Sequence, residues 1–188
     1  SSVLAILPIF HGFGLGVCVN ACFMGGGKSI LVPVFTPETV ASLIRSRKPS
    51  FVIGVPTLFD ALSRDPKMQK ADLSCLRATF SGADALPRPV KERFESMVKR
   101  QGGNVQLLEG YGLTEAVTAI MATPLGNYRE GSIGVPFPDM LAKIVKIGTT
   151  EEAPPGEEGE ICVSGPAVMM GYIDQPQETA ETLKTHAD

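Results

Sequence analysis

The stretch "LLEGYGLTEAV", residues 107–117, joins an apolar run to a polar turn. Leu107 and Leu108 have the continuous apolar character of a strand that is buried on both faces. The turn that follows carries an aromatic ring, a hydroxyl and two carboxylates around Gly110 and Gly112. Ligands of open α/β sheets bind beyond the carboxyl ends of the strands. This stretch therefore predicts both the fold class and the position of a site.

Strands and helices alternate on the N-terminal side of this stretch. Thr36 can cap the first predicted helix, Pro37 fits its first turn, and Gly102 is placed to end the third. The predicted strands cover residues 28–34, 50–55, 76–82 and 104–110, and the predicted helices cover 36–47, 56–65 and 86–102. Such alternation predicts an α/β fold with a parallel sheet flanked by helices.

The pattern changes near Thr123, where glycines and prolines begin to separate short apolar runs. These runs predict antiparallel strands joined by turns, and a short helix follows them. The predicted strands cover 141–148 and 160–166, and the helix covers 176–184. We therefore expect an α/β subdomain over residues 1–123 and a smaller antiparallel β-rich subdomain over residues 124–188.

Composition limits the classes of function. The 188 residues are 44% hydrophobic and 20% charged, as in an ordinary soluble domain. A net charge of -3 argues against a nucleic-acid partner, and no apolar run reaches the length of about 20 residues that a transmembrane anchor needs. The four cysteines lie in apolar stretches without framework spacing, which favours free thiols in a reducing compartment. We expect a cytoplasmic protein; peripheral membrane association and oligomeric state stay open.

Two glycine-containing turns, at 81–86 and 109–115, would meet at one crevice if their strands are neighbours. Tyr111 offers a flat face to a base, and the adjacent glycines let backbone approach a ligand. Thr114 offers a hydroxyl to a phosphate oxygen, and Glu115 suits a hard cation such as Mg²⁺. The alternative is a structural turn in which Thr114 caps a helix and Tyr111 packs. The pattern alone leaves both interpretations open.

Two further features are weaker signals. The run "MGGGKS" (24–29) is not a phosphate-binding loop, because Cys22 stands where that motif needs glycine and Lys28 opens a strand. We interpret its glycines as a helix stop. His11 lies in "LPIFHGFG" (7–14), which is expected to end a strand, and the other histidine is His186. No serine–histidine–aspartate set has suitable spacing, which argues against a hydrolase triad.

Five motifs, in order, resemble those of acyl-CoA synthetases in the adenylate-forming (AMP-binding) ligase superfamily. They are "LPIFHGFG" (7–14), "SGADAL" (81–86), "EGYGLTE" (109–115), "GSIGVPFP" (131–138) and "GEICVSGPAVMMGY" (159–172). The run "VPTLFDAL" (55–62), together with "LLEGYGLTE", is most similar to the long-chain fatty-acid branch. Leu113 also fits acyl-CoA ligases better than peptide-synthetase adenylation domains, which usually have proline there.

The resemblance implies an ATP-dependent ligase with fatty acid, ATP, Mg²⁺ and CoA as small-molecule partners. It implies that Tyr111 stacks on adenine, Thr114 contacts the α-phosphate, and Glu115 holds Mg²⁺, with Thr114 and Glu115 as the catalytic pair. The implied nucleotide-binding residues are Gly82, Ala83, Asp84, Glu109, Gly110, Tyr111, Gly112, Leu113 and Thr114. The implied acyl pocket comprises His11, Gly82, Gly112 and Gly134.

The chain also departs from the family pattern. The family's phosphate loop precedes "LPIFH", its ribose-binding aspartate would follow Asp188, and its catalytic lysine belongs to a C-terminal domain. Asp84 and Asp139 stand where the family often has small residues or glycine. We therefore expect an internal fragment of the large N-terminal domain, inactive alone. The alternatives are a module that loads acyl groups onto a carrier protein and a non-catalytic nucleotide- or acyl-binding module; acyl chain length is not encoded.

Overall fold

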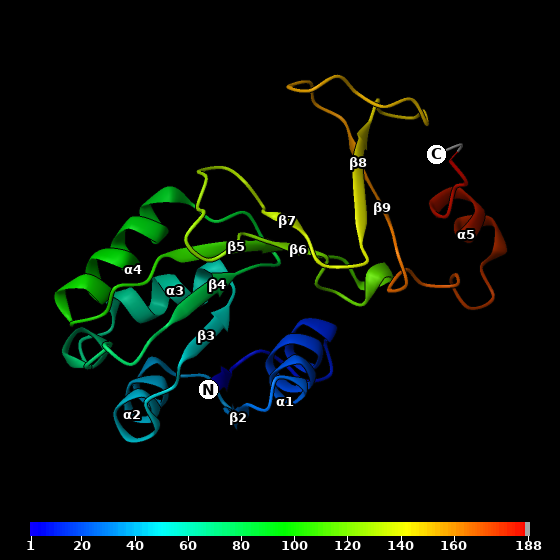
Figure 1. Cartoon of the computed structure of the whole chain (residues 1–188). Coiled ribbons are helices and arrows are strands. Elements are labelled where there is room, and N and C mark those ends of the chain that lie inside the picture. Colours follow the sequence, from blue (N-terminus) through cyan, green and yellow to red (C-terminus); the bar gives the residue numbers. More distant parts are fainter. Residues whose placement is uncertain (187–188) are drawn as a thin grey trace.

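A central sheet organises the computed structural model of the chain, which describes residues 1–186 (Figure 1). Within these residues seven strands form the sheet, in the order β2-β1-β3-β4-β5-β6-β7. Strands β1 to β5 pair in parallel, and β6 and β7 continue the sheet in antiparallel pairs. The bounds are β1 Ser2–Ala5, β2 Lys28–Leu31, β3 Phe51–Gly54, β4 Ala78–Ser81, β5 Leu107–Tyr111, β6 Met121–Ala122 and β7 Val135–Pro136.

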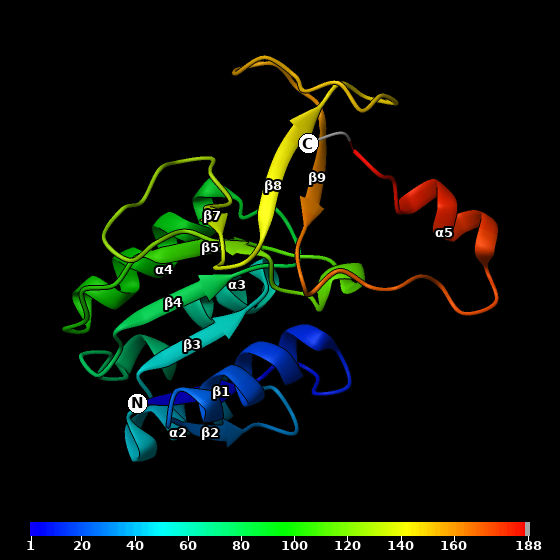
Figure 2. The ribbon, with the colours of Figure 1, turned by 45° about the vertical axis from the view of Figure 1, so that its right-hand side comes forward.

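Helices cover both faces of the parallel strands, which confirms the predicted α/β class. Figure 2 shows α3 and α4 behind the strands, with the helical segment that contains α1 in front. One face is covered by α2 Pro37–Arg47, α3 Pro56–Arg64 and α4 Arg88–Arg100. The other face is covered by the π-helix η1 Phe13–Ala21 and the short α1 Cys22–Met24.

Alternation along the strands explains why both faces are covered. Leu4 points into the core beneath α2 to α4, whereas Val3 and Ala5 pack against η1 and α1. In the larger core, Phe59 of α3 and Phe94 of α4 meet edge to face with ring centroids 4.9 Å apart. The strands β1, β3 and β4 are therefore covered on both sides, as predicted for apolar strands, whereas the edge strand β2 has no buried residue.

The C-terminal part is a separate hairpin followed by a helix. Within the described residues, β8 Leu141–Val145 and β9 Glu160–Ser164 form a two-stranded antiparallel sheet that projects from the larger one (Figure 1). The helix α5 Pro176–Thr182 follows, and none of its described residues is buried. The predicted antiparallel part is confirmed, although β7 lies beyond residue 123 and still pairs with the large sheet. The last residues of the predicted second subdomain, Ala187 and Asp188, lie outside the described residues.

Local signals in the sequence place the helix ends correctly. The Thr36 hydroxyl accepts a hydrogen bond from the Thr39 amide at 3.0 Å, so Thr36 caps α2. Gly102 follows α4 with a φ of +79°, the left-handed conformation that ends many helices. The 3₁₀ turn η2 Met68–Lys70 lies between α3 and β4. The glycines after Met24 end α1, as expected.

One expectation about the N-terminal strand is wrong. The strand β1 ends at Ala5, so His11 does not lie at a strand end. The His11 amide instead donates to the carbonyl of Pro8 at 3.2 Å, which makes a turn that leads into η1. All four cysteines are free, and Cys18 and Cys22 are buried. No helix within residues 1–186 has the length and apolarity that crossing a membrane requires.

Candidate functional site

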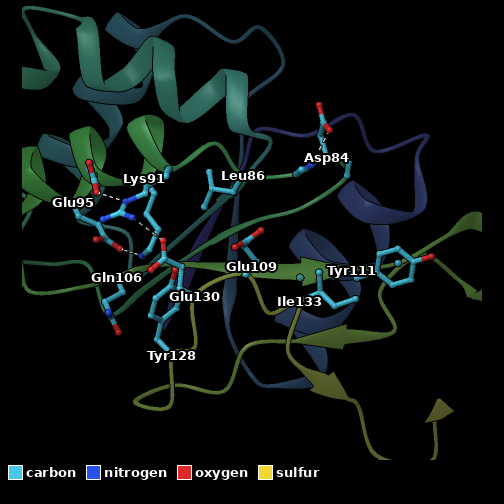
Figure 3. A pocket seen from close by; sticks show the side chains of 17 residues that line it. Asp84, Leu86, Lys91, Glu95, Gln106, Glu109, Tyr111, Tyr128, Glu130 and Ile133 are labelled. Atoms are coloured by element: carbon cyan, nitrogen blue, oxygen red, sulfur yellow. Dashed lines mark hydrogen bonds and ion pairs between the residues drawn. The ribbon is translucent and has the colours of Figure 1, made fainter. Parts of the chain in front are cut away.

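The two predicted turns meet at one cavity. Strands β4 and β5 are parallel neighbours, with Ser81 beside Glu109, so both turns leave the same edge of the sheet. A cavity of about 760 Å³ lies there (Figure 3). Residues from both turns line it: Ala83, Asp84, Ala85 and Leu86 from the first, and Glu109, Gly110, Tyr111 and Gly112 from the second. The expected juxtaposition of the two turns is therefore confirmed.

Side chains in the first half of α4 and in the loop between β6 and β7 form the far wall of the cavity. The Lys91 ammonium lies 4.1 Å from the centroid of the Tyr128 ring. It also donates to the Leu107 carbonyl at 3.1 Å and forms an ion pair with Glu95. Glu95 in turn accepts a hydrogen bond from the Leu107 amide at 2.8 Å. The buried charge of Lys91 is thus compensated, and the loop is held against α4.

Sequence reasoning missed this far wall. Lys91 and Glu95 are four residues apart on a helix, a spacing that could have indicated an ion pair. The contribution of Tyr128 could not be foreseen, because it comes from a loop with no periodic pattern. Burial is the main cause that raises the pKa of Tyr128, and the nearby Glu109 carboxylate adds to it.

The glycines around the cavity are required by the chain's own packing. A Cβ added to Gly112 would lie 1.2 Å from the Thr118 carbonyl oxygen. Gly134 has a φ of +98°, and its Cβ would lie 1.9 Å from the Ala122 carbonyl carbon. At Gly82 the Phe13 ring would lie 3.1 Å away. Neighbouring backbone therefore requires glycine at Gly112, and Gly112 also lines the cavity, so close approach of a ligand to its backbone stays a prediction.

Thr114 and Glu115 lie beside the cavity and do not line it. They begin η3 Thr114–Ala116, a 3₁₀ turn of three residues whose N-cap is Leu113. The interpretation of Thr114 as a helix cap is therefore wrong. Thr114 is exposed, and the η3 turn is too short to carry a helix dipole.

Glu115 is held by a residue far along the chain. Its Oε1 accepts a hydrogen bond from the Tyr172 hydroxyl at 2.8 Å. This bond is the largest cause that holds the pKa of Glu115 below its usual range, so the carboxylate is ionised at neutral pH. Within residues 1–186, no three His, Cys, Asp or Glu side chains are grouped to hold a metal ion. A single ionised carboxylate suits Mg²⁺, which takes most of its ligands from phosphate and water.

The other predicted residues surround the two turns. The Nδ1 atom of the exposed His11 accepts a hydrogen bond from the Phe13 amide at 3.1 Å, and Phe13 itself packs against Gly82. The carboxylate of Asp84 accepts a hydrogen bond from the Ala85 amide at 2.8 Å and points away from Glu109 (Figure 3). The turn that holds His11 thus lies behind the cavity, and His11 is not part of its lining.

Comparisons with known proteins agree with this geometry. The family described as "AMP-binding enzyme" matches residues 1–173. The long-chain-fatty-acid–CoA ligase of Bacillus subtilis is 42% identical over 183 residues, which are 97% of this chain and 32% of that protein. A probable 4-coumarate–CoA ligase of Dictyostelium discoideum is 36% identical over the same shares of the two chains. This chain therefore spans about a third of the length of these relatives.

A solved structure has the same fold. The crystal structure of ATP-bound MatB from Rhodopseudomonas palustris superimposes with a TM-score of 0.86 at 28% identity, over 98% of this chain and 35% of that one. The two relatives are named as CoA ligases, and the solved structure contains bound ATP. From the matched residues, the shared fold and the paired turns, the chain belongs to the AMP-binding enzyme family.

Proposed function

We propose that the chain is part of an ATP-dependent fatty acyl-CoA ligase. The observation that carries the proposal is the cavity at the carboxyl ends of β4 and β5, lined by the turns after both strands. A nucleotide needs an aromatic or apolar contact for its base and room for its phosphates, and Tyr111 and Thr114 lie on one such turn. The identity to the Bacillus subtilis enzyme supports a fatty acid as the acyl substrate.

In this proposal each residue has a separate role. Tyr111 stacks on adenine, with the turn from Gly82 to Asp84 and the residues from Glu109 to Leu113 around the base. Thr114 contacts the α-phosphate. The acyl group lies on the side of Gly82 and Gly112 that Phe13 and the His11 turn cover, with Gly134 deeper in the pocket. This arrangement separates the base from the acyl chain and leaves the α-phosphate between them.

The proposed reaction has two steps. In the first, the carboxylate of the fatty acid forms a bond to the α-phosphorus of ATP, and the bond to the β-phosphate breaks to release pyrophosphate. In the second, the thiol of CoA loses its proton to solvent and its sulfur bonds to the acyl carbon. The bond from that carbon to the phosphate oxygen breaks, and AMP leaves. Both reactants of the first step are anions, so phosphate charge must be neutralised. Bound Mg²⁺ supplies that neutralisation, and Glu115 is the residue that holds it.

The proposal concerns a whole ligase of which this chain is about a third. The proposal includes a division of the chain into subdomains 1–123 and 124–188. It also includes a cytoplasmic location, with which the free thiols are compatible. We expect the chain by itself to make no acyl-CoA. A carrier protein in place of CoA is the alternative acceptor, and comparing a phosphopantetheinyl carrier with CoA in the complete ligase distinguishes them.

Calorimetric titration of Mg²⁺–ATP into the chain tests nucleotide binding. Tyr111→Leu is expected to weaken binding about 10-fold or more, since stacking of a base on an aromatic ring is worth about 1–3 kcal/mol. Phe23→Leu is the matched control, because Phe23 is 60% exposed on α1 and does not line the cavity. Equal affinities for the two variants, or no binding by the unmodified chain, would contradict the proposed site.

A further inference from the structure

Tyr172 is joined to the η3 turn across 57 positions of sequence. Its hydroxyl donates to Glu115 Oε1 at 2.8 Å. In the same segment the Met169 amide donates to the Glu115 carbonyl at 2.7 Å. Glu115 is thus fixed through both its backbone and its side chain by residues that follow β9. In Figures 1 and 2 the segment between β9 and α5 passes beside the turn after β5.

A small apolar core supports the contact between Tyr172 and Glu115, and a hydrogen bond joins the Tyr172 segment to α5. Ala116 and Ile120 are buried in a small core that also contains Val163, Ala167 and Val168 around the segment. Behind Tyr172, its own amide donates to the Thr179 hydroxyl at 2.9 Å, which ties it to α5. The Met169 hydrogen bond and the small core therefore hold the tyrosine hydroxyl against the carboxylate, and the bond to Thr179 joins the segment to α5.

We infer that Tyr172 is a positioning residue that orients the Glu115 carboxylate toward the metal-bound phosphates. The inference rests on the proposed function, which assigns Mg²⁺ to Glu115. A donor on Oε1 fixes the rotation of the carboxylate group, and the inference assigns the cation to the other oxygen, Oε2. Hydrogen bonds of this kind to a metal ligand commonly change metal affinity about 10- to 100-fold when they are removed.

Two variants of the chain distinguish a loss of orientation of the Glu115 carboxylate from a general increase in the mobility of the segment that holds Tyr172. Tyr172→Phe removes the hydroxyl and keeps the ring. Thr179→Val removes the hydrogen bond that ties the same segment to α5, without touching Glu115. Glu115→Gln reports whether Glu115 contributes to the metal site at all.

The first measurement is amide hydrogen exchange in the absence of metal and nucleotide. Tyr172→Phe is expected to accelerate exchange at Met169 and in the turn from Leu113 to Thr118. Thr179→Val is expected to accelerate it at Tyr172 and in α5 only. Unchanged exchange at Met169 and in that turn in Tyr172→Phe would overturn the inference, whatever the metal data show.

The second measurement is Mn²⁺ binding in the presence of ATP, followed by electron paramagnetic resonance. We expect Tyr172→Phe to weaken Mn²⁺ binding about 10-fold, Thr179→Val to leave it unchanged, and Tyr172→Phe to add no loss in the Glu115→Gln background. Three outcomes would overturn this inference and leave the proposed metal site standing. Mn²⁺ binding could fall in Glu115→Gln but not in Tyr172→Phe, or it could fall equally in Tyr172→Phe and Thr179→Val. The losses of Tyr172→Phe and Glu115→Gln could also add in the double variant. No effect of Glu115→Gln, or no Mn²⁺–ATP binding, would overturn the proposed metal site and this inference with it.

Discussion

The sheet with its helices and the projecting hairpin are stabilised in different ways. Large apolar side chains such as Phe59, Leu62 and Phe94 are 2% exposed or less in the first region. In the hairpin, Leu141 is 71% exposed and Ile147 in the following turn is 80% exposed. The first region therefore depends on a large apolar core, whereas the second has its backbone ladder, contacts near Glu115 and only a few buried side chains such as Val145 and Met140. Equal chemical changes should have unequal effects in the two regions.

The largest effect is expected in the core between α3 and α4. Leu62→Ala should lower the free energy of unfolding by about 2–5 kcal/mol, because it leaves a cavity beneath two helices. Urea denaturation followed by circular dichroism measures the change. Leu62→Met, which roughly conserves volume, should cost less than about 1.5 kcal/mol. A loss below 1 kcal/mol in Leu62→Ala would show that this core repacks freely.

An intermediate effect is expected from pH. Burial, and to a lesser extent Cys22, raises the pKa of Cys18 from 9.0 to about 12. The unfolded chain therefore loses this proton first as pH rises. The contribution of Cys18 to stability is fully present below pH 9 and falls between pH 9 and about 12, by about 1.4 kcal/mol per pH unit inside that window.

Unfolding measured at pH 8 and at pH 10.5 tests this contribution. Cys18→Ala should be less sensitive to the change in pH than the unmodified chain. Cys162→Ala removes a half-buried thiol from β9, leaves Cys18 in place, and should keep the full sensitivity. Identical pH dependence in Cys18→Ala and the unmodified chain would rule Cys18 out as the cause.

The smallest effect is expected on the face of the hairpin. Leu141→Ala repeats the change made at Leu62 and should alter the free energy of unfolding by less than about 0.5 kcal/mol, because the side chain is 71% exposed. The same denaturation experiment measures it. A loss comparable with that of Leu62→Ala would mean that the hairpin face is covered in solution, and the contrast between the two regions would fail.

Most of the first region could be predicted from the sequence, because its signals are local. Thr36 marks a helix start and Gly102 a helix end, and both act within one turn of the residues they affect. The meeting of the two cavity turns was predicted only on the condition that their strands are neighbours, and β4 and β5 meet that condition. The strands β6 and β7 could not be predicted, since two-residue strands such as Val135–Pro136 have no measurable periodicity.

The site was predicted less completely, because its remaining contacts join distant positions. The partner of Glu115 is 57 residues away, and the ring above Lys91 comes from a loop. In the sequence Tyr172 stands at the end of a motif, and nothing in its spacing connects it to Glu115. The binding experiments on Tyr111→Leu and Glu115→Gln test the roles of those two residues, and the role of Thr114 stays a prediction.

The crowding at Gly112 and Gly134 limits how this family member can vary. At both positions a methyl group would overlap main-chain atoms of a neighbouring segment, at 1.2 Å and 1.9 Å respectively. Flexible side chains can move aside, but main chain of a paired strand or its turn cannot do so without shifting the cavity wall. A laboratory library of variants of this chain would therefore lose the clones altered at these two codons.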